Sequence, residues 1–137
     1  MLGNSGNNIR APFGVKSGED ITFRNNSVVG DLPANAFAMR VNVENSLVTN
    51  DRINFYNNIY SDPTGTMGTG QGGGTNDFSD SPLEEVDDWQ LLGNLYWNNG
   101  GPIPSSTSDV INYTADTSAV LANPQLAAQQ SLVIPRW

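Results

Sequence analysis

Three segments of this chain repeat one short pattern, in which an apolar strand ends on asparagine and then continues with apolar or aromatic residues. The segments cover residues 21–28, 53–60 and 89–96. When they are aligned, Asn26, Asn58 and Asn94 share one column at a spacing of 32 to 36 residues. A repeat of this length is typical of solenoid proteins. The pattern therefore constrains the architecture more than it constrains an activity.

We expect an all-β fold, a right-handed parallel β-helix (solenoid) of about three to four turns. In such a fold, equivalent positions of successive turns lie about 4.8 Å apart and form parallel ladders. An asparagine amide both donates and accepts, so Asn26, Asn58 and Asn94 can bond to one another and to the backbone of the bends. We call this expected row the asparagine ladder. A β-sandwich is the alternative, but no good Asn-Gly hairpin separates two alternating runs.

The repeat predicts a single β-helix domain over residues 1–137. Its parts are a partial first turn at 1–20, turns at 21–52, 53–88 and 89–122, and a C-terminal tail or cap at 123–137. Residues 61–88 form a Gly-rich and acidic loop excursion from the second turn. Short strands are expected at 21–23, 37–41, 53–56, 89–92, 95–97 and 110–113. The one expected helical turn is 123–130, where Asn123 is the cap.

The charge balance argues against some partners. The chain has 14 acidic and 6 basic residues, a formal net charge of −8, and neither cysteine nor histidine. The basic residues look scattered along the sequence, so we expect no nucleic-acid partner. No apolar run approaches the length of a spanning helix, so we expect no membrane insertion.

Several stretches resemble a family of secreted bacterial right-handed parallel β-helix proteins, the broad superfamily of pectate-lyase-like folds. The matching stretches are 9–18, 21–31, 55–65, 94–98 and 123–126. The resemblance implies the C-terminal turns of a longer protein, an extracellular or cell-surface location, and a signal peptide outside this chain. It does not imply a reaction, because such folds host lyases, hydrolases, tailspikes and adhesins alike.

Three aspartates are candidates for catalytic residues. Asp20 and Asp88 directly precede equivalent strand positions, and Asp51 lies two residues before the matching position of its own strand. Stacked carboxylates raise one another's pKa, so one of them could serve as the general acid of a glycosidase. Aspartate is also common at bends, where it caps backbone N–H groups.

The acidic part of the excursion is the best metal candidate. Calcium takes six to eight oxygen ligands, and this loop offers several carboxylates within a short stretch. The spacing does not match an EF-hand loop, and a solvated charged loop is the alternative. The candidate ligands are Asp77, Asp80, Glu84, Glu85, Asp87 and Asp88. Apart from calcium, no cofactor is expected.

Aromatic residues suggest a sugar-binding hypothesis. Tyr and Trp rings can stack on sugar rings, and a repeat presents such rings at regular intervals along a groove. The candidates are Tyr56, Tyr60, Tyr96 and Trp97. Packing in the core is the alternative, because stacked aromatics are common inside a β-helix.

Together these features favour a non-catalytic segment of a secreted or cell-surface β-helix protein, with a structural or glycan-binding role and a polysaccharide as partner. A fragment of a polysaccharide lyase or glycoside hydrolase is the first alternative. The second is a self-assembling β-solenoid, because open ends expose unpaired strand edges that can form homo-oligomers or fibres.

Overall fold

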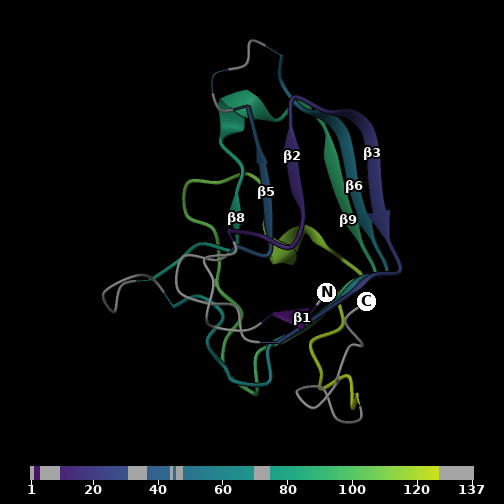
Figure 1. The fold of residues 1–137 in the computed structure, drawn as a ribbon, viewed down its shortest axis with the longest axis vertical. Helices are drawn as coiled ribbons and strands as arrows, with labels where there is room; N and C mark the ends of the chain where they lie inside the picture. The colour runs from purple at the N-terminus through teal and green to yellow at the C-terminus, as the bar shows by residue number, and fades with distance from the viewer. Residues whose placement is uncertain are drawn as a thin grey trace, which may run out of the picture.

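In the computed structural model the chain is all-β, with its strands in three parallel sheets (Figure 1). The structure describes residues 2–3, 10–30, 37–43, 45, 48–69 and 75–126. Within these ranges there is no α-helix, and the helical segments η2 (Leu83–Glu85) and η3 (Tyr113–Ala115) are 3₁₀ turns. None of the helical segments described is long and apolar enough to cross a membrane.

The strands return to the same three sheets in a fixed order. Sheet A contains β1 (Leu2–Gly3), β4 (Ser27–Gly30), β7 (Ile59–Ser61) and β10 (Leu95–Trp97). Sheet B contains β2 (Gly14–Lys16), β5 (Met39–Asn42) and β8 (Ser79–Asp80). Sheet C contains β3 (Glu19–Arg24), β6 (Asp51–Tyr56) and β9 (Trp89–Leu92). From β2 onward the chain visits sheets B, C and A and then repeats that order.

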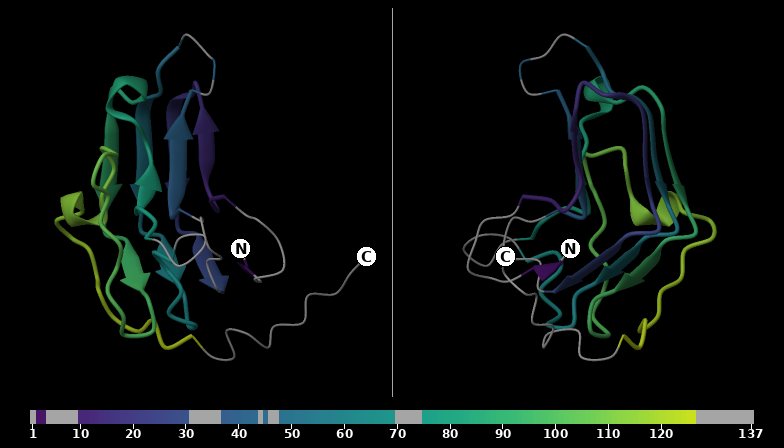
Figure 2. Two further views of the ribbon diagram at one scale, coloured as in Figure 1. Left: turned by 90° about the vertical axis from the view of Figure 1, so that its left-hand side faces the viewer. Right: turned by 45° about the vertical axis from the view of Figure 1, so that its right-hand side comes forward.

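All strand pairings among the described residues are parallel. Figure 2 shows the strands following one another from the purple N-terminal end to the green later part of the chain. This arrangement confirms the expected all-β parallel architecture and is compatible with a parallel β-solenoid. It argues against the sandwich alternative, in which hairpins would produce antiparallel neighbours.

Side chains that face inward stack from one strand to the next and form the core. Ile53 and Phe55 are fully buried on β6. The rings of Phe23 and Phe55 stack with centroids 5.2 Å apart, and those of Tyr60 and Tyr96 stack at 5.4 Å. These separations are close to the strand spacing of a β-sheet, because ring pairs at equivalent positions inherit that spacing.

The bend between sheets C and A explains why the repeat contains paired polar residues. The residue before each ladder asparagine has a left-handed backbone, with φ of 57° at Asn25, 53° at Asn57 and 69° at Gly93. Asparagine and glycine tolerate this conformation better than other residues do. The first residue of each pair therefore makes the bend, and the second carries the ladder side chain.

The ladder side chains are linked in series by their amides. Asn26 Nδ2 donates to Asn58 Oδ1 at 3.0 Å, and Asn58 Nδ2 donates to Asn94 Oδ1 at 3.0 Å. The same two oxygens accept the backbone N–H of Asn26 at 3.1 Å and of Asn58 at 2.9 Å. Asp116 continues the pattern, since its Oδ2 accepts both Asn94 N and Asn94 Nδ2 at 2.9 Å. Its distance of 22 residues from Asn94 lies outside the repeat, so the sequence pattern did not include it.

Residues after β10 cover part of the C-terminal end of the sheets. Val120 forms a parallel bridge with Leu95, and its backbone N–H donates to Asn94 O at 2.9 Å. The predicted strand at 110–113 is wrong, because Tyr113 begins a 3₁₀ turn capped by Asn112. The predicted helical turn is also wrong over the described residues 123–126, which are not helical, and its remainder lies outside the described residues.

The predicted excursion contributes more to the fold than a loop would. Within residues 61–88, strand β8 pairs with β5 in sheet B, and Phe78 beside it is fully buried. At the start of this segment the carboxylate of Asp62 accepts the backbone N–H groups of Thr64 at 2.8 Å and Thr66 at 3.1 Å. The glycine-rich stretch at 70–74 lies outside the described residues.

Candidate functional site

The outer face of sheet B brings together polar side chains from β2 and β5. Alternation along β2 turns Val15 into the core, where it is 5% exposed, and turns Gly14 and Lys16 outward. The parallel register places Gly14 opposite Arg40 and Lys16 opposite Asn42. Two residues from each strand therefore meet on the same face.

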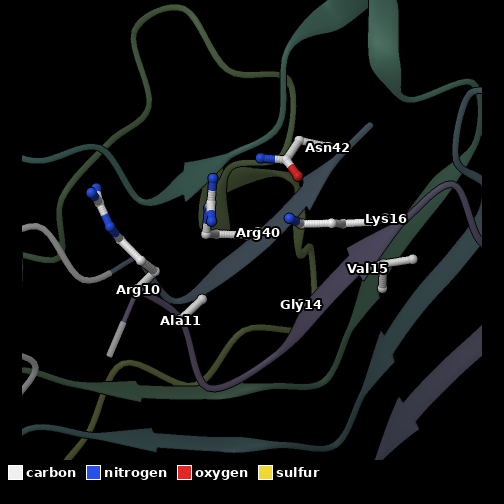
Figure 3. A pocket seen from close by; sticks show the side chains of 7 residues that line it. All are labelled: Arg10, Ala11, Gly14, Val15, Lys16, Arg40 and Asn42. Atoms are coloured by element: carbon white, nitrogen blue, oxygen red, sulfur yellow. The ribbon is translucent and has the colours of Figure 1, made fainter. Parts of the chain in front are cut away.

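A cavity of about 390 Å³ lies on this face (Figure 3). It is lined by Arg10, Ala11, Gly14, Val15, Lys16, Arg40 and Asn42. Figure 3 shows Val15 pointing away from the basic side chains. Three of the six basic residues of the chain thus share one pocket.

This convergence corrects the expectation that the basic residues are scattered. Arg10 and Arg40 are far apart in the sequence, yet Phe37 N donates to Arg10 O at 2.8 Å and thereby holds the segment before β2 against the segment before β5. The pairing of β2 with β5 does the rest. A repeat in the sequences of the sheet B strands could have predicted the pocket, but these strands lack the apolar–asparagine pattern that marks sheet C.

One carboxylate partly balances the charge of the pocket. Asp80 lies opposite Arg40 on β8, and its Oδ2 is 2.5 Å from Arg40 Nε. The same oxygen accepts Asn42 Nδ2 at 3.1 Å. Three basic side chains therefore line this pocket, and Asp80 contacts Arg40 there, on a chain whose formal net charge is −8.

The floor of the pocket is open above Gly14. A Cβ built on Gly14 would meet no heavy atom within 4 Å, and Gly14 does not have a positive φ. A side chain at this position would therefore fill the pocket without straining the backbone. The empty space lies next to Arg40, the register partner of Gly14.

The candidate catalytic aspartates do not form the expected column. Asp51 pairs with Glu19, one position away from the register needed to stack it on Asp20. Ile21, Ile53 and Trp89 are register partners in sheet C. The residues directly before them are Asp20, Arg52 and Asp88, so Arg52 lies between the two aspartates. The prediction included Asp51 in the column although it lies two residues before Ile53, and the residue that directly precedes Ile53 is the cation Arg52.

Arg52 binds the acidic residues around it. Its Nε lies 2.5 Å from Asp20 Oδ1, and its guanidinium also contacts Glu19 and Asp51. The hydrogen bond from Arg52 lowers the pKa of the Asp20 carboxyl. A general acid needs a raised pKa, so this environment works against that role for Asp20.

The six candidate metal ligands spread over separate neighbours. Within the described part of the chain, no group of three or more acidic side chains is placed to hold a metal ion. Asp80 contacts Arg40, Glu85 Oε2 accepts Val43 N at 2.7 Å, and Asp87 accepts the Thr49 hydroxyl. Asp77 lies 3.5 Å from Thr107 N, whereas Glu84 and Asp88 are exposed. The carboxylates of this loop contact different parts of the protein and do not converge on one point.

Asp109 is an acidic residue that the sequence analysis did not select. Its Oδ1 accepts the backbone N–H of Ser81. Burial raises the pKa of the Asp109 carboxyl, and the nearby charges of Asp80 and Asp77 raise it further, whereas the bond from Ser81 lowers it.

Two of the four aromatic candidates for sugar binding are core residues. Tyr60 and Tyr96 are 0% and 1% exposed, and burial raises the pKa of both hydroxyl groups. Their rings cannot reach a sugar, so the sugar-contact hypothesis fails for them. Tyr56 lies on the outer face of β6 with its hydroxyl 2.6 Å from Gln90 Oε1, while Trp97 is half-buried on β10 in another sheet.

No protein-family model matches the chain, and no curated protein or solved structure matches it either.

Proposed function

We propose that this protein is a non-catalytic segment of a secreted or cell-surface right-handed parallel β-helix protein, and that it binds an acidic glycan in the sheet B pocket. The observation that carries the binding role is the convergence of Arg10, Lys16 and Arg40 around a cavity of about 390 Å³. The parallel all-β architecture and the sequence resemblance to pectate-lyase-like folds support the proposal that the protein is a secreted or cell-surface β-helix.

Charge and shape together favour a ligand that carries a negative group. Guanidinium and ammonium groups form charge-assisted hydrogen bonds with carboxylates and sulfates, which are about twice as strong as neutral ones. The net charge of the chain is negative and disfavours the approach of polyanions in general, so a cluster of basic residues is the surface on which such a ligand is best held. Binding should weaken as salt is added, because both partners are partly exposed to solvent.

A glycan array followed by calorimetry tests the proposal. Acidic oligosaccharides should bind, neutral ones of equal length should not, and the affinity should fall with rising salt. Gly14→Leu should abolish binding by filling the cavity, and Arg10→Ala should weaken it about tenfold. Arg24→Ala is the matched control, because it removes the same charge from the exposed end of β3 in sheet C. Equal loss in the control, or equal binding of neutral glycans, would refute the proposal.

The enzymatic alternative lacks a comparable observation, since Arg52 occupies the centre of the acidic column. Reducing-end assays and lyase absorbance assays on the same glycans test it directly. We expect no product from either assay.

Self-association is a second candidate function, favoured by the edge of sheet C. Among the described residues, β3 is the outermost strand at one edge of this sheet. Its inward residues Ile21 and Phe23 remain partly exposed, whereas their equivalents Ile53 and Phe55 are fully buried. Such an edge can pair with another chain. Light scattering over a range of concentrations should show dimers or larger species, and a monomer throughout would exclude this function.

A further inference from the structure

A buried amide oxygen at the pocket has no hydrogen-bond partner. It is Oδ1 of Asn42, a β5 residue that lines the pocket and is 4% exposed. The amide of the same side chain donates through Nδ2 to Asp80 Oδ2 at 3.1 Å. The reversed amide would face this carboxylate with its oxygen, which is repulsive, so the unpaired atom is the acceptor.

An unpaired buried acceptor is costly and calls for an explanation. Such a group loses its hydrogen bonds to water without a replacement, and buried polar groups are normally satisfied by protein, water or ligand. Lys16 is the register partner of Asn42 and lies on the same outer face. Its four-carbon side chain is exposed and flexible, so it can move as a ligand enters the pocket that it shares with Asn42.

We propose that the ligand carries a hydroxyl group beside its anionic group, and that this hydroxyl donates to Asn42 Oδ1 while the basic residues hold the anion. The inference rests on the proposed function of the same pocket and names Asn42 as its specificity-determining residue. Acidic sugars carry both groups within one ring. A bare anion offers no donor and leaves the oxygen unpaired.

Two small probes separate the contributions of the anion and the hydroxyl. Propanoate and lactate carry the same carboxylate, and lactate adds one hydroxyl on the neighbouring carbon. In an NMR titration of the wild-type chain, lactate should bind about tenfold more tightly than propanoate, which corresponds to one hydrogen bond. The side-chain amide signal of Asn42 should shift with lactate more than with propanoate.

The variant Asn42→Leu keeps a similar volume and removes the acceptor. Lactate affinity should fall to that of propanoate, while propanoate affinity should change less than about twofold, because the basic residues remain. Asn42→Val is a second variant with a side chain suited to a strand. Arg24→Ala, on another sheet, should leave both affinities unchanged.

The outcomes distinguish this inference from the function on which it rests. If neither probe binds, or if Gly14→Leu does not prevent binding, the pocket is not an anion site and both proposals fail. If propanoate and lactate bind the wild-type chain equally, the hydroxyl inference is wrong and the anion site stands. This second comparison uses the wild-type chain and does not depend on the folding of any variant.

Discussion

Replacement of Asn94 by alanine should destabilise the protein far more than the same change at Asn26. Asn94 is fully buried, and its side chain makes four hydrogen bonds inside the structure. They join it to Asn58 N, Asn58 Nδ2, Phe55 O and Asp116 Oδ2 at 2.9 to 3.0 Å. Asn26 is exposed and sits at the other end of the ladder.

The expected magnitude follows from what each substitution leaves behind. After Asn94→Ala, Asn58 Nδ2 keeps its bond to Phe23 O and Asp116 Oδ2 keeps the Asn94 backbone N–H, but the buried Asn58 N–H loses its acceptor. Lost hydrogen bonds contribute about 1 kcal/mol each and a stranded buried group adds to this, so we expect a loss of about 4 kcal/mol. Asn26→Ala exposes its former partners to water and should cost about 1 kcal/mol or less.

Equilibrium unfolding in urea, followed by circular dichroism, measures both changes. A loss of about 4 kcal/mol should also lower the Tm by about 15 °C in a domain of this size. The wild-type chain and Asn26→Ala serve as references under the same conditions. If the two variants differ by less than about 1 kcal/mol, the side-chain bonds of Asn94 do not support the turns and the reasoning is refuted.

Further predictions concern backbone strain and titration. Gly93→Ala should lower the free energy of unfolding by about 1–2 kcal/mol, because its φ is 69° and a new Cβ would lie 2.7 Å from Asn57 Oδ1; an unchanged urea midpoint would contradict this. Asp109→Asn should raise the Tm at pH 7, because burial raises the pKa of the Asp109 carboxyl and makes its ionised form unfavourable in the folded state. This gain should shrink as the pH falls through the raised pKa, and a constant difference between pH 7 and pH 3 in calorimetry would disprove it. Asp20→Asn should show the opposite sign, since the hydrogen bond from Arg52 lowers the pKa of Asp20: its loss of Tm at pH 7 should vanish at a pH below the lowered value, and a loss that persists there would exclude this cause.

The strand register in sheet C shows which sequence predictions were correct and which were wrong. Ile21, Ile53 and Trp89 align in the structure as they do in the repeat, because each begins an inward-facing row of sheet C. Asp51 was included in the acidic column although it lies two residues before Ile53, and the structure keeps the same register there, with Asp51 opposite Glu19. An offset of one residue exchanges neighbours on a sheet, so Arg52 stands where the prediction had a third carboxylate, and it forms ion pairs with the acidic residues around it.

The chain by itself determined the parallel all-β architecture and the residues that line up along sheet C and the adjoining bend, since a repeated apolar phrase and left-handed Asn or Gly positions are local properties of the sequence. The pocket was decided by tertiary structure alone. Arg10, Lys16 and Arg40 meet because β2 pairs with β5, and Asn42 Oδ1 lacks a partner because of how these strands and Asp80 pack. Core residues repeat in the sequence because they must pack against their equivalents in neighbouring strands. Residues on the outer face of a sheet do not have this constraint, so basic residues that converge there from distant segments show no periodic pattern.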